Sequence, residues 1–136
     1  MRQRTLIRNA TIYDGTGGRP FFGDVLIGGG LIRKIGRFLH EEDCTVVDGS
    51  GKILTPGFIN CHSHSELQPF YNPRMLQVIG QGITTELVGQ DGLSVAPIDD
   101  AHAAELTENM ICLCGKAKRD FWWRSHREYM QLAEEA

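Results

Sequence analysis

The chain has 136 residues, of which 41% are hydrophobic and 23% are charged, and its formal net charge at pH 7 is −3. This length fits about one domain and is far short of the roughly 250 residues of a complete (β/α)₈ barrel. The near balance of charges excludes the basic footprint of a nucleic-acid-binding protein, and the short apolar runs exclude a membrane-spanning helix.

The N-terminus carries no recognisable targeting segment. Residues 1–4 are mildly basic, but no apolar segment of a signal peptide follows them. The four cysteines are therefore expected to be reduced thiols rather than a disulfide framework. Together these features predict a cytoplasmic protein.

The first third of the chain has the pattern of β-structure. Residues 6–12 form an extended run that ends at a glycine-rich turn, and residues 24–27 and 31–36 flank the turn Gly28-Gly29-Gly30. Two apolar runs around a glycine turn are typical of a hairpin. Residues 45–48 are a further short strand. We therefore predict that residues 1–54 form a β domain.

The middle of the chain changes to an alternation of strand and helix. Residues 53–62 form a longer apolar run, as expected for a strand buried on both faces. Residues 72–80 have helix punctuation, with Asn72 as N-cap, Pro73 at the first position and Gly80 at the end. Residues 83–88 are again β-rich, so we expect a β-α-β unit with parallel strands and a right-handed crossover.

The last third is predicted to be helical. Asp99 or Asp100 can cap a helix that runs to Cys114 and closes at Gly115. A second helix begins at the capping box formed by Ser125 and Glu128, and it continues to Ala136.

The strongest chemical signal is the pair His62 and His64, which follows the apolar run. Side chains at i and i+2 of a strand point to one face, so two imidazoles can converge on one metal ion. The carboxyl end of a strand is also where barrel and open α/β enzymes build their sites. Two ordinary loop histidines are the alternative interpretation.

The context of this pair resembles a known family. Residues 56–64, PGFINCHSH, resemble the PGFID-x-H-x-H signature of the amidohydrolase superfamily, and residues 81–97, QGITTELVGQDGLSVAP, are similar to the QGVTT…GNCG-[IL]-S-x-AP stretch of the D-aminoacylases, or N-acyl-D-amino-acid deacylases. Residues 10–17 resemble that family's first strand and turn. Members are metal-dependent hydrolases on a (β/α)₈ barrel, with a small β-sandwich formed by the two chain ends.

The resemblance implies a fold and a ligand set. Residues 1–54 would be the N-terminal part of the β-sandwich, and residues 55–136 the start of a truncated barrel catalytic domain with two of its eight βα units. His62 and His64 match metal ligands of the family. Asp91 stands where the family usually has a metal-binding cysteine, and a carboxylate binds zinc at about the same distance as imidazole. An ordinary turn residue in Gln-Asp-Gly is the alternative for Asp91.

Two neighbouring polar residues are weaker candidates. Asn60 replaces the aspartate of the signature, and it could support a ligand histidine or simply pair locally in the strand. Glu66 could contact substrate or order the loop, although a solvated loop charge is the expectation we favour.

Other features are expected to be structural. Cys112 and Cys114 have poor zinc spacing, and the run Phe121-Trp122-Trp123 is expected to pack in a core. The remaining histidines, which have no ligand-spaced neighbours, are expected at the surface: His40, His102 and His126.

The resemblance also implies a reaction. One or two divalent metal ions, zinc above all, would activate a water for attack on the amide of a small N-acyl-D-amino acid. The remaining histidines and the aspartate that acts as general acid/base would lie beyond Ala136. The catalytic residues are thus unknown here, the rest of the same chain is the expected partner, and the 136 residues alone are expected to be inactive. The alternatives are a cyclic-amide hydrolase, like hydantoinases and dihydroorotases, and a non-catalytic metal-binding or interaction module.

Overall fold

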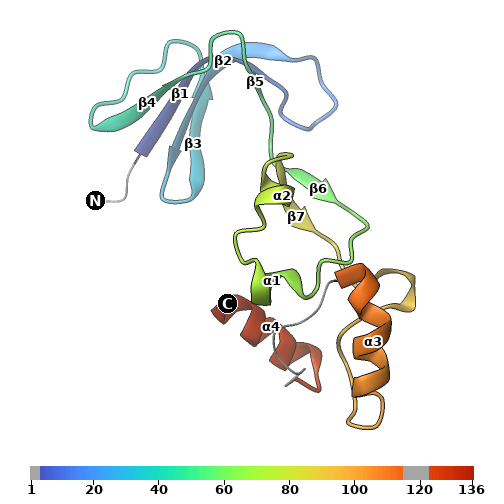
Figure 1. The fold of residues 1–136 in the computed structure, drawn as a ribbon. Coiled ribbons are helices and arrows are strands. Elements are labelled where there is room, and N and C mark those ends of the chain that lie inside the picture. The colour runs from blue at the N-terminus through green and yellow to red at the C-terminus, as the bar shows by residue number, and fades with distance from the viewer. Residues whose placement is uncertain (1–3, 115–122) are drawn as a thin grey trace. The chain divides into compact units, whose positions relative to one another are not determined.

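The computed structural model describes residues 4–114 and 123–136. The chain divides into two compact units, Met1–Pro56 and Gly57–Ala136, and each is described by itself (Figure 1). The division falls two residues from the boundary predicted at 54/55.

The first unit is a β-sheet. Its strands are β1 (Arg4–Ile12), β2 (Phe21–Gly28), β3 (Leu31–Gly36), β4 (Cys44–Asp48) and β5 (Ile53–Leu54). The order is β3-β2-β1-β4, with β5 also paired to β1. The hairpin β2–β3 is confirmed as antiparallel, and β1 pairs in parallel with β4 and β5. The predicted strands are thus present, with β2 extending beyond residues 24–27.

A buried carboxylate shapes the centre of this sheet. Ala10, Ile12 and Val25 form the core cluster, and the β1–β2 register shifts between Ile7 and Ala10. Asp24 is 3% exposed, and it accepts hydrogen bonds of 2.8 Å from the backbone N–H groups of Asn9 and Leu39. The bond from Asn9 satisfies a backbone donor at the irregularity, and the bond from Leu39 ties the chain after β3 to the same carboxylate.

The second unit combines a short parallel sheet with helices. Its elements are β6 (Phe58–Asn60), α1 (Gln68–Tyr71), α2 (Leu76–Ile79), β7 (Ile83–Glu86), the 3₁₀ turn η1 (Gln90–Gly92), α3 (Ala103–Cys114) and α4 (His126–Glu135). Strands β6 and β7 lie side by side and are parallel, which confirms the predicted relation (Figure 1). The handedness of the crossover stays a prediction.

The core of this unit gathers around aromatic rings. Phe70 stacks on Trp123 with ring centroids 5.0 Å apart, and Tyr129 meets both rings edge-on. The buried residues around them come from three segments of the unit: Leu67, Val95, Ala96, Ile98 and Met110. The expected core role of Trp123 is therefore confirmed, whereas Phe121 and Trp122 lie outside the described residues.

The prediction of one strand over residues 53–62, buried on both faces, was wrong. The run is broken between β5 and β6, because Pro56 has no N–H to donate to a strand partner and Gly57 does not favour continued strand structure. Phe58 and Ile59 are 56% and 66% exposed. In the described part of the chain β6 has one neighbour, β7, so its other edge is unpaired.

The prediction of a helix over residues 72–80 was also wrong in its start. Asn72 is the C-cap of α1 rather than an N-cap, and α2 covers residues 76–79 alone. Met75 has a φ of 43°, in the left-handed region, which prevents a helix from running through it. The Asn72 side chain instead donates a 2.8 Å hydrogen bond to Gln77.

The two later helices follow the sequence pattern. Asp99 accepts from the backbone N–H of His102 just before α3, while Asp100 pairs with Arg124 instead. The capping box of Ser125 and Glu128 opens α4 as expected, and the predicted stop at Gly115 lies outside the described residues. No helix in the described part of the chain has the length and apolar character needed to cross a membrane.

Candidate metal centre

The two histidines lie in the loop that leaves β6. Pairing between the two strands continues past their ends, because the Leu87 N–H donates to the Asn60 carbonyl (2.8 Å) and the Ser63 N–H donates to the Leu87 carbonyl (3.2 Å). The backbone on both sides of His62 is thus tied to the segment after β7. This holds the His62-Ser63-His64 loop at the carboxyl end of the parallel pair.

Asp91 reaches the same place from the turn after β7. It sits in η1 with a φ of 58°, and Gly89 and Gly92 on either side have φ values of 82° and 73°. Left-handed backbone is easy for glycine and tolerable for aspartate, so this sequence suits the tight turn. The turn directs the carboxylate back toward the histidine loop.

The three side chains meet at one point. His62 Nε2 lies 2.9 Å from Asp91 Oδ2, and His64 Nε2 lies 3.4 Å from the same oxygen. One ligand atom from each residue falls within 4.8 Å of the others. His62 and Asp91 each expose 59% of their side chain and His64 exposes 18%, so the cluster is open on one side.

This geometry fits a divalent metal ion. Ligand atoms about 2.0–2.2 Å from a tetrahedral zinc ion lie about 3.3 Å from one another. The His64–Asp91 separation is already close to this value, and the His62–Asp91 separation needs a small outward shift. Two imidazoles and a carboxylate are also a donor set that zinc accepts in sites with an open coordination position.

His64 has a second ring nitrogen that the cluster does not use. Among the described residues, His64 Nδ1 is buried and has no hydrogen-bond partner. An unpaired buried polar atom is unfavourable, and the free nitrogen of a metal-binding histidine is normally hydrogen-bonded. The described residues alone therefore leave the surroundings of His64 incomplete.

Asn60 contacts the loop backbone rather than an imidazole ring. Its Oδ1 accepts from the His62 N–H (3.3 Å), and its Nδ2 donates to Glu86 Oε1 (3.0 Å). The local pairing considered for Asn60 is therefore present, and support of a ligand histidine stays a prediction.

Glu86, at the end of β7, was not singled out by the sequence. Its carboxylate accepts from Ser65 Oγ (2.6 Å), Ser63 Oγ (3.0 Å) and Asn60 Nδ2 (3.0 Å). Burial alone raises the pKa of this carboxyl, but the three hydrogen bonds outweigh burial and hold the pKa below its ordinary value. Glu86 is therefore a carboxylate that three hydrogen bonds hold against the histidine loop.

Glu66 is a buried group, so the favoured expectation of a solvated loop charge was wrong. Only 2% of the residue is exposed, and its Oε1 accepts a 2.7 Å hydrogen bond from the Gly89 N–H. Leu67 next to it lies in the aromatic core, which carries Glu66 inward. The alternative role of ordering a loop agrees with this contact, and contact with substrate stays a prediction.

The other histidines and the free cysteines of the described residues are not part of this group of three. His40, His102 and His126 are exposed, and His102 pairs with Asp99 at 2.7 Å. Cys61 and Cys112 are free, exposed thiols. Within the described residues, His62, His64 and Asp91 are the one group of three with the spacing of a metal site.

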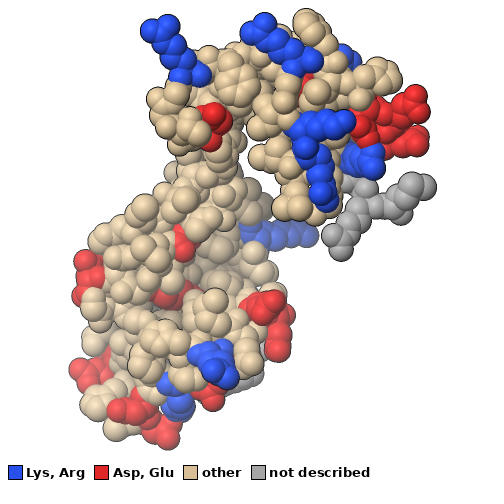
Figure 2. Space-filling view, turned by 180° about the vertical axis from the view of Figure 1, so that it is seen from behind, with Lys and Arg blue, Asp and Glu red and all other residues tan. Residues whose placement is uncertain are grey.

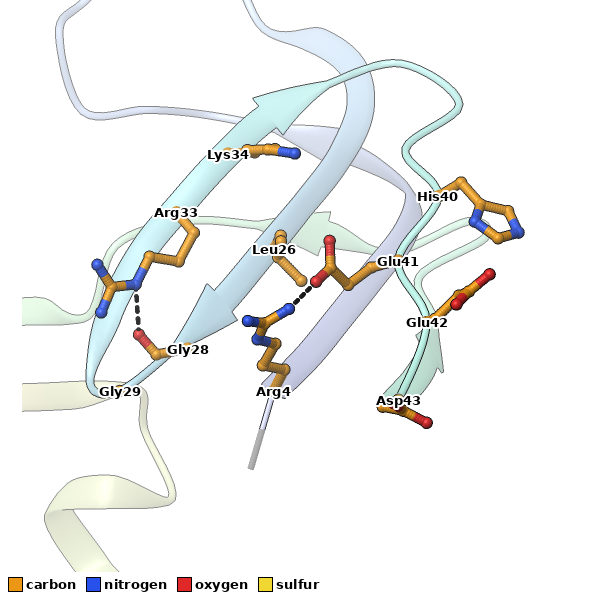
Figure 3. Close-up of a pocket in the computed structure, with 10 residues that line it drawn as sticks. All are labelled: Arg4, Leu26, Gly28, Gly29, Arg33, Lys34, His40, Glu41, Glu42 and Asp43. Carbon is orange, nitrogen blue, oxygen red and sulfur yellow. Dashed lines mark hydrogen bonds and ion pairs between the residues drawn. The ribbon is translucent and has the colours of Figure 1, made fainter. Parts of the chain in front are cut away.

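A separate hollow of about 950 Å³ lies in the first unit, beside the β2–β3 hairpin. Figure 3 shows Arg4 pointing toward Glu41, with which it forms an ion pair, and Arg33 donating to the Gly28 carbonyl at 2.7 Å. Glu42 and Asp43 also line it. Because acidic side chains accompany the basic ones, the hollow has no clear preference for an anion or a cation.

The described part of the second unit carries more acidic than basic side chains. Its described residues include three basic side chains, Arg74, Arg124 and Arg127, against many carboxylates. Figure 2 shows red atoms dominating over blue ones on the visible face of this unit. Such a surface favours the approach of cations over anions.

Comparison with known proteins gives a consistent set of relatives. An N-acyl-D-aspartate deacylase of Alcaligenes xylosoxydans xylosoxydans is 41% identical over 93 residues, which are 68% of this chain and 19% of the relative. The chain thus spans about a fifth of the length of the curated relatives that it matches. No protein-family model matches the chain.

Solved structures agree with the sequence relatives. An N-acyl-D-glutamate deacylase from Bordetella bronchiseptica, complexed with zinc and a phosphonate inhibitor, superposes with a TM-score of 0.69 and 34% identity over 76% of this chain and 22% of its own. A D-aminoacylase with a binuclear metal centre gives 0.80 and 26% identity, over 93% of this chain and 26% of its own.

The fold and the histidine pair define a member of the amidohydrolase superfamily. Within that superfamily, the chain belongs to the branch of the N-acyl-D-amino-acid deacylases, or D-aminoacylases, and it matches part of their length.

Proposed function

We propose that His62, His64 and Asp91 bind a divalent metal ion, zinc above all, in an enzyme that hydrolyses the amide bond of N-acyl-D-amino acids. The observation that carries this proposal is the convergence of three ligand atoms within 4.8 Å, in a chain 41% identical to a deacylase. The relative with bound zinc and the relative with a binuclear centre support a site for one or two ions.

The proposal includes a layout for the two units. Strands β1–β5 would be part of a small β-sandwich, and β6 and β7 would be the first two strands of a (β/α)₈ barrel. The parallel pairing of β6 with β7, and the placement of all three ligands after the carboxyl ends of these strands, support this layout. The exposed apolar side chains of Phe58 and Ile59 fit strands that further barrel elements cover.

The residues of this chain would bind the metal ion and hold it in place. A bound divalent ion supplies Lewis acidity for a water and for an amide carbonyl. His62 and His64 would donate neutral nitrogen ligands, and Asp91 would add a negative charge that balances the ion. The general acid/base is not assigned to any residue of this chain, and in an enzyme of the relatives' length it would come from the other four-fifths.

The substrate class is proposed from the relatives. The named relatives act on N-acyl derivatives of D-aspartate and D-glutamate, which favours an acyl-amino acid over the cyclic amides considered as an alternative. A cytoplasmic location is proposed with it.

Zinc titration of the full chain tests the metal site. Replacing His64 or Asp91 by alanine is expected to weaken zinc binding by about tenfold or more, because each change removes one of three ligands. His40→Ala, at an exposed histidine remote in sequence from the cluster, is the matched control and is expected to bind like the parent. Equal affinity in the parent, His64→Ala and Asp91→Ala would refute the site.

A further inference from the structure

Two glutamates connect the histidine loop with the β7 strand and the turn that follows it. Glu86 belongs to the second strand and holds the histidine loop, whereas Glu66 belongs to the histidine loop and holds the turn that carries Asp91. We propose that Glu86 and Glu66 are positioning residues that set His62, His64 and Asp91 at metal-binding distance. This inference rests on the proposed metal site and deepens it.

The contacts of Glu86 fix the loop on both sides of each histidine. Ser63 lies between His62 and His64, Ser65 follows His64, and both hydroxyls donate to the Glu86 carboxylate at 3.0 Å and 2.6 Å. Asn60, two residues before His62, donates to the same carboxylate at 3.0 Å. Because side chains alternate along an extended segment, holding Ser63 and Ser65 leaves the imidazoles of His62 and His64 free to face Asp91.

The contact of Glu66 fixes the second loop. Its carboxylate accepts from the backbone N–H of Gly89, the residue directly before η1 and two residues before Asp91. A hydrogen bond is electrostatically stronger in the low dielectric of a buried position than in water. A shift of Gly89 would move Asp91 with it, because the turn is short.

The aromatic core anchors the backbone of Glu66. The Tyr129 hydroxyl donates to the Glu66 carbonyl at 2.8 Å, and Leu67 is buried beside the Trp123 and Tyr129 rings. Glu66 is therefore anchored to the rigid part of the unit. The depressed pKa of Glu86 is consistent with a carboxylate that stays ionised in its three hydrogen bonds.

Cobalt binding to the full chain separates positioning from general stability. We would measure the Co²⁺ dissociation constant and the visible absorption of the saturated complex for Glu86→Leu and Glu66→Leu, which remove the acceptors. Glu86→Gln and Glu66→Gln keep one acceptor oxygen, and Glu134→Leu, at an exposed glutamate of α4, is the control.

We expect the effect on Co²⁺ binding to be larger in the leucine variants than in the glutamine variants. Each leucine variant should raise the Co²⁺ dissociation constant by about ten- to a hundredfold, as for other groups that orient metal ligands. The absorption of the saturated complex should change with it, and each glutamine variant should fall between leucine and parent. A change in stability alone would leave the absorption of the saturated complex unchanged, and parent-like affinity and absorption in the four variants would overturn the proposal.

A second readout needs no metal. Amide hydrogen exchange should accelerate at Ser63 in Glu86→Leu and at Gly89 in Glu66→Leu, and unchanged exchange at both would overturn the positioning role. A parent chain that binds no Co²⁺, with the exchange changes present, would contradict the proposed function and leave the loop connections standing. Circular dichroism identifies any leucine variant that fails to fold, in which case the glutamine variant decides.

Discussion

Gly57 is a position near the site where a side chain does not fit, because the backbone lies close to Thr84. A Cβ placed there would lie 2.0 Å from Thr84 Oγ1 and 2.7 Å from Thr84 Cβ, on the neighbouring strand. A contact this short with the Thr84 Cβ cannot be relieved by rotating the threonine side chain. The close approach allows β6 to pair with β7 and so places the histidine loop.

Gly57→Ala is therefore expected to disturb the metal centre from outside it. We predict a destabilisation of about 1–3 kcal/mol, as for other overpacked sites, and zinc binding weaker than in the parent. Adding Thr84→Gly should restore much of both, because it removes the atoms that clash. Chemical denaturation and zinc titration of the single and double variants check this, and a Gly57→Ala chain that behaves like the parent would contradict it.

The residues of the candidate site differ in how far the sequence reveals them. His62 and His64 could be singled out by their local spacing after a predicted strand, and Asp91 by the resemblance of residues 81–97 to the deacylase family. Glu86 was not singled out, and the contact that Glu66 makes could not be predicted, because their partners are 21–26 and 23 residues away and include a backbone N–H. Burial of Glu66 follows from the packing of Leu67, which a sequence pattern does not show.

At the scale of the element, helix α4 is built on a local signal. Ser125 accepts from the Glu128 N–H, and the Glu128 carboxylate accepts in return from the N–H groups of Ser125 and Arg124. The backbone hydrogen bonds from Arg124 and then Ser125 lower the pKa of Glu128 below its ordinary value of 4.5. A lowered pKa means that the folded chain favours the ionised carboxyl.

This shift predicts a pH-dependent contribution to stability. A carboxyl with a lowered pKa stabilises the fold above its ordinary value and loses this effect as pH falls through its folded pKa. Glu128→Gln should therefore lower the thermal midpoint at pH 7, and the difference from the parent should shrink below about pH 4.5. Thermal unfolding at pH 7 and pH 3 measures this, and an equal difference at both pH values would argue against it.

Other elements show where local signals fail. The capping box of α4 and the hairpin β2–β3 were predictable because their determinants are neighbours in sequence. Asn72 and Pro73 have the same appearance as a helix start, yet Asn72 closes α1, and the left-handed Met75 delays α2. The Asn72 side chain bonds to Gln77 instead, so the helix start that Asn72 and Pro73 indicate is not formed there.

At the scale of the whole molecule, the chain consists of two units with separate cores. The first is centred on Ala10, Ile12 and Val25, and the second on Leu67, Met110 and Trp123. The three proposed ligands lie in the second unit, and both tryptophans of the sequence also fall within Gly57–Ala136.

This division predicts that zinc stabilises one unit selectively. At a free zinc concentration of a hundred times Kd, the second unit should gain about 2.7 kcal/mol. Tryptophan fluorescence should report a higher urea midpoint with zinc, while the amide signals of β1 and β2 should keep theirs. Equal shifts for both probes would show that the two units unfold as one.

X-ray absorption at the zinc edge tests the central claim most directly, because it identifies the atoms bound to the ion. For the zinc-loaded chain we predict nitrogen and oxygen neighbours at about 2.0–2.2 Å, with the outer scattering of two imidazoles. Asp91→Ala should remove one light neighbour from the first shell or replace it with a water. A sulfur neighbour at about 2.3 Å, or a first shell without imidazole, would contradict a site made of His62, His64 and Asp91.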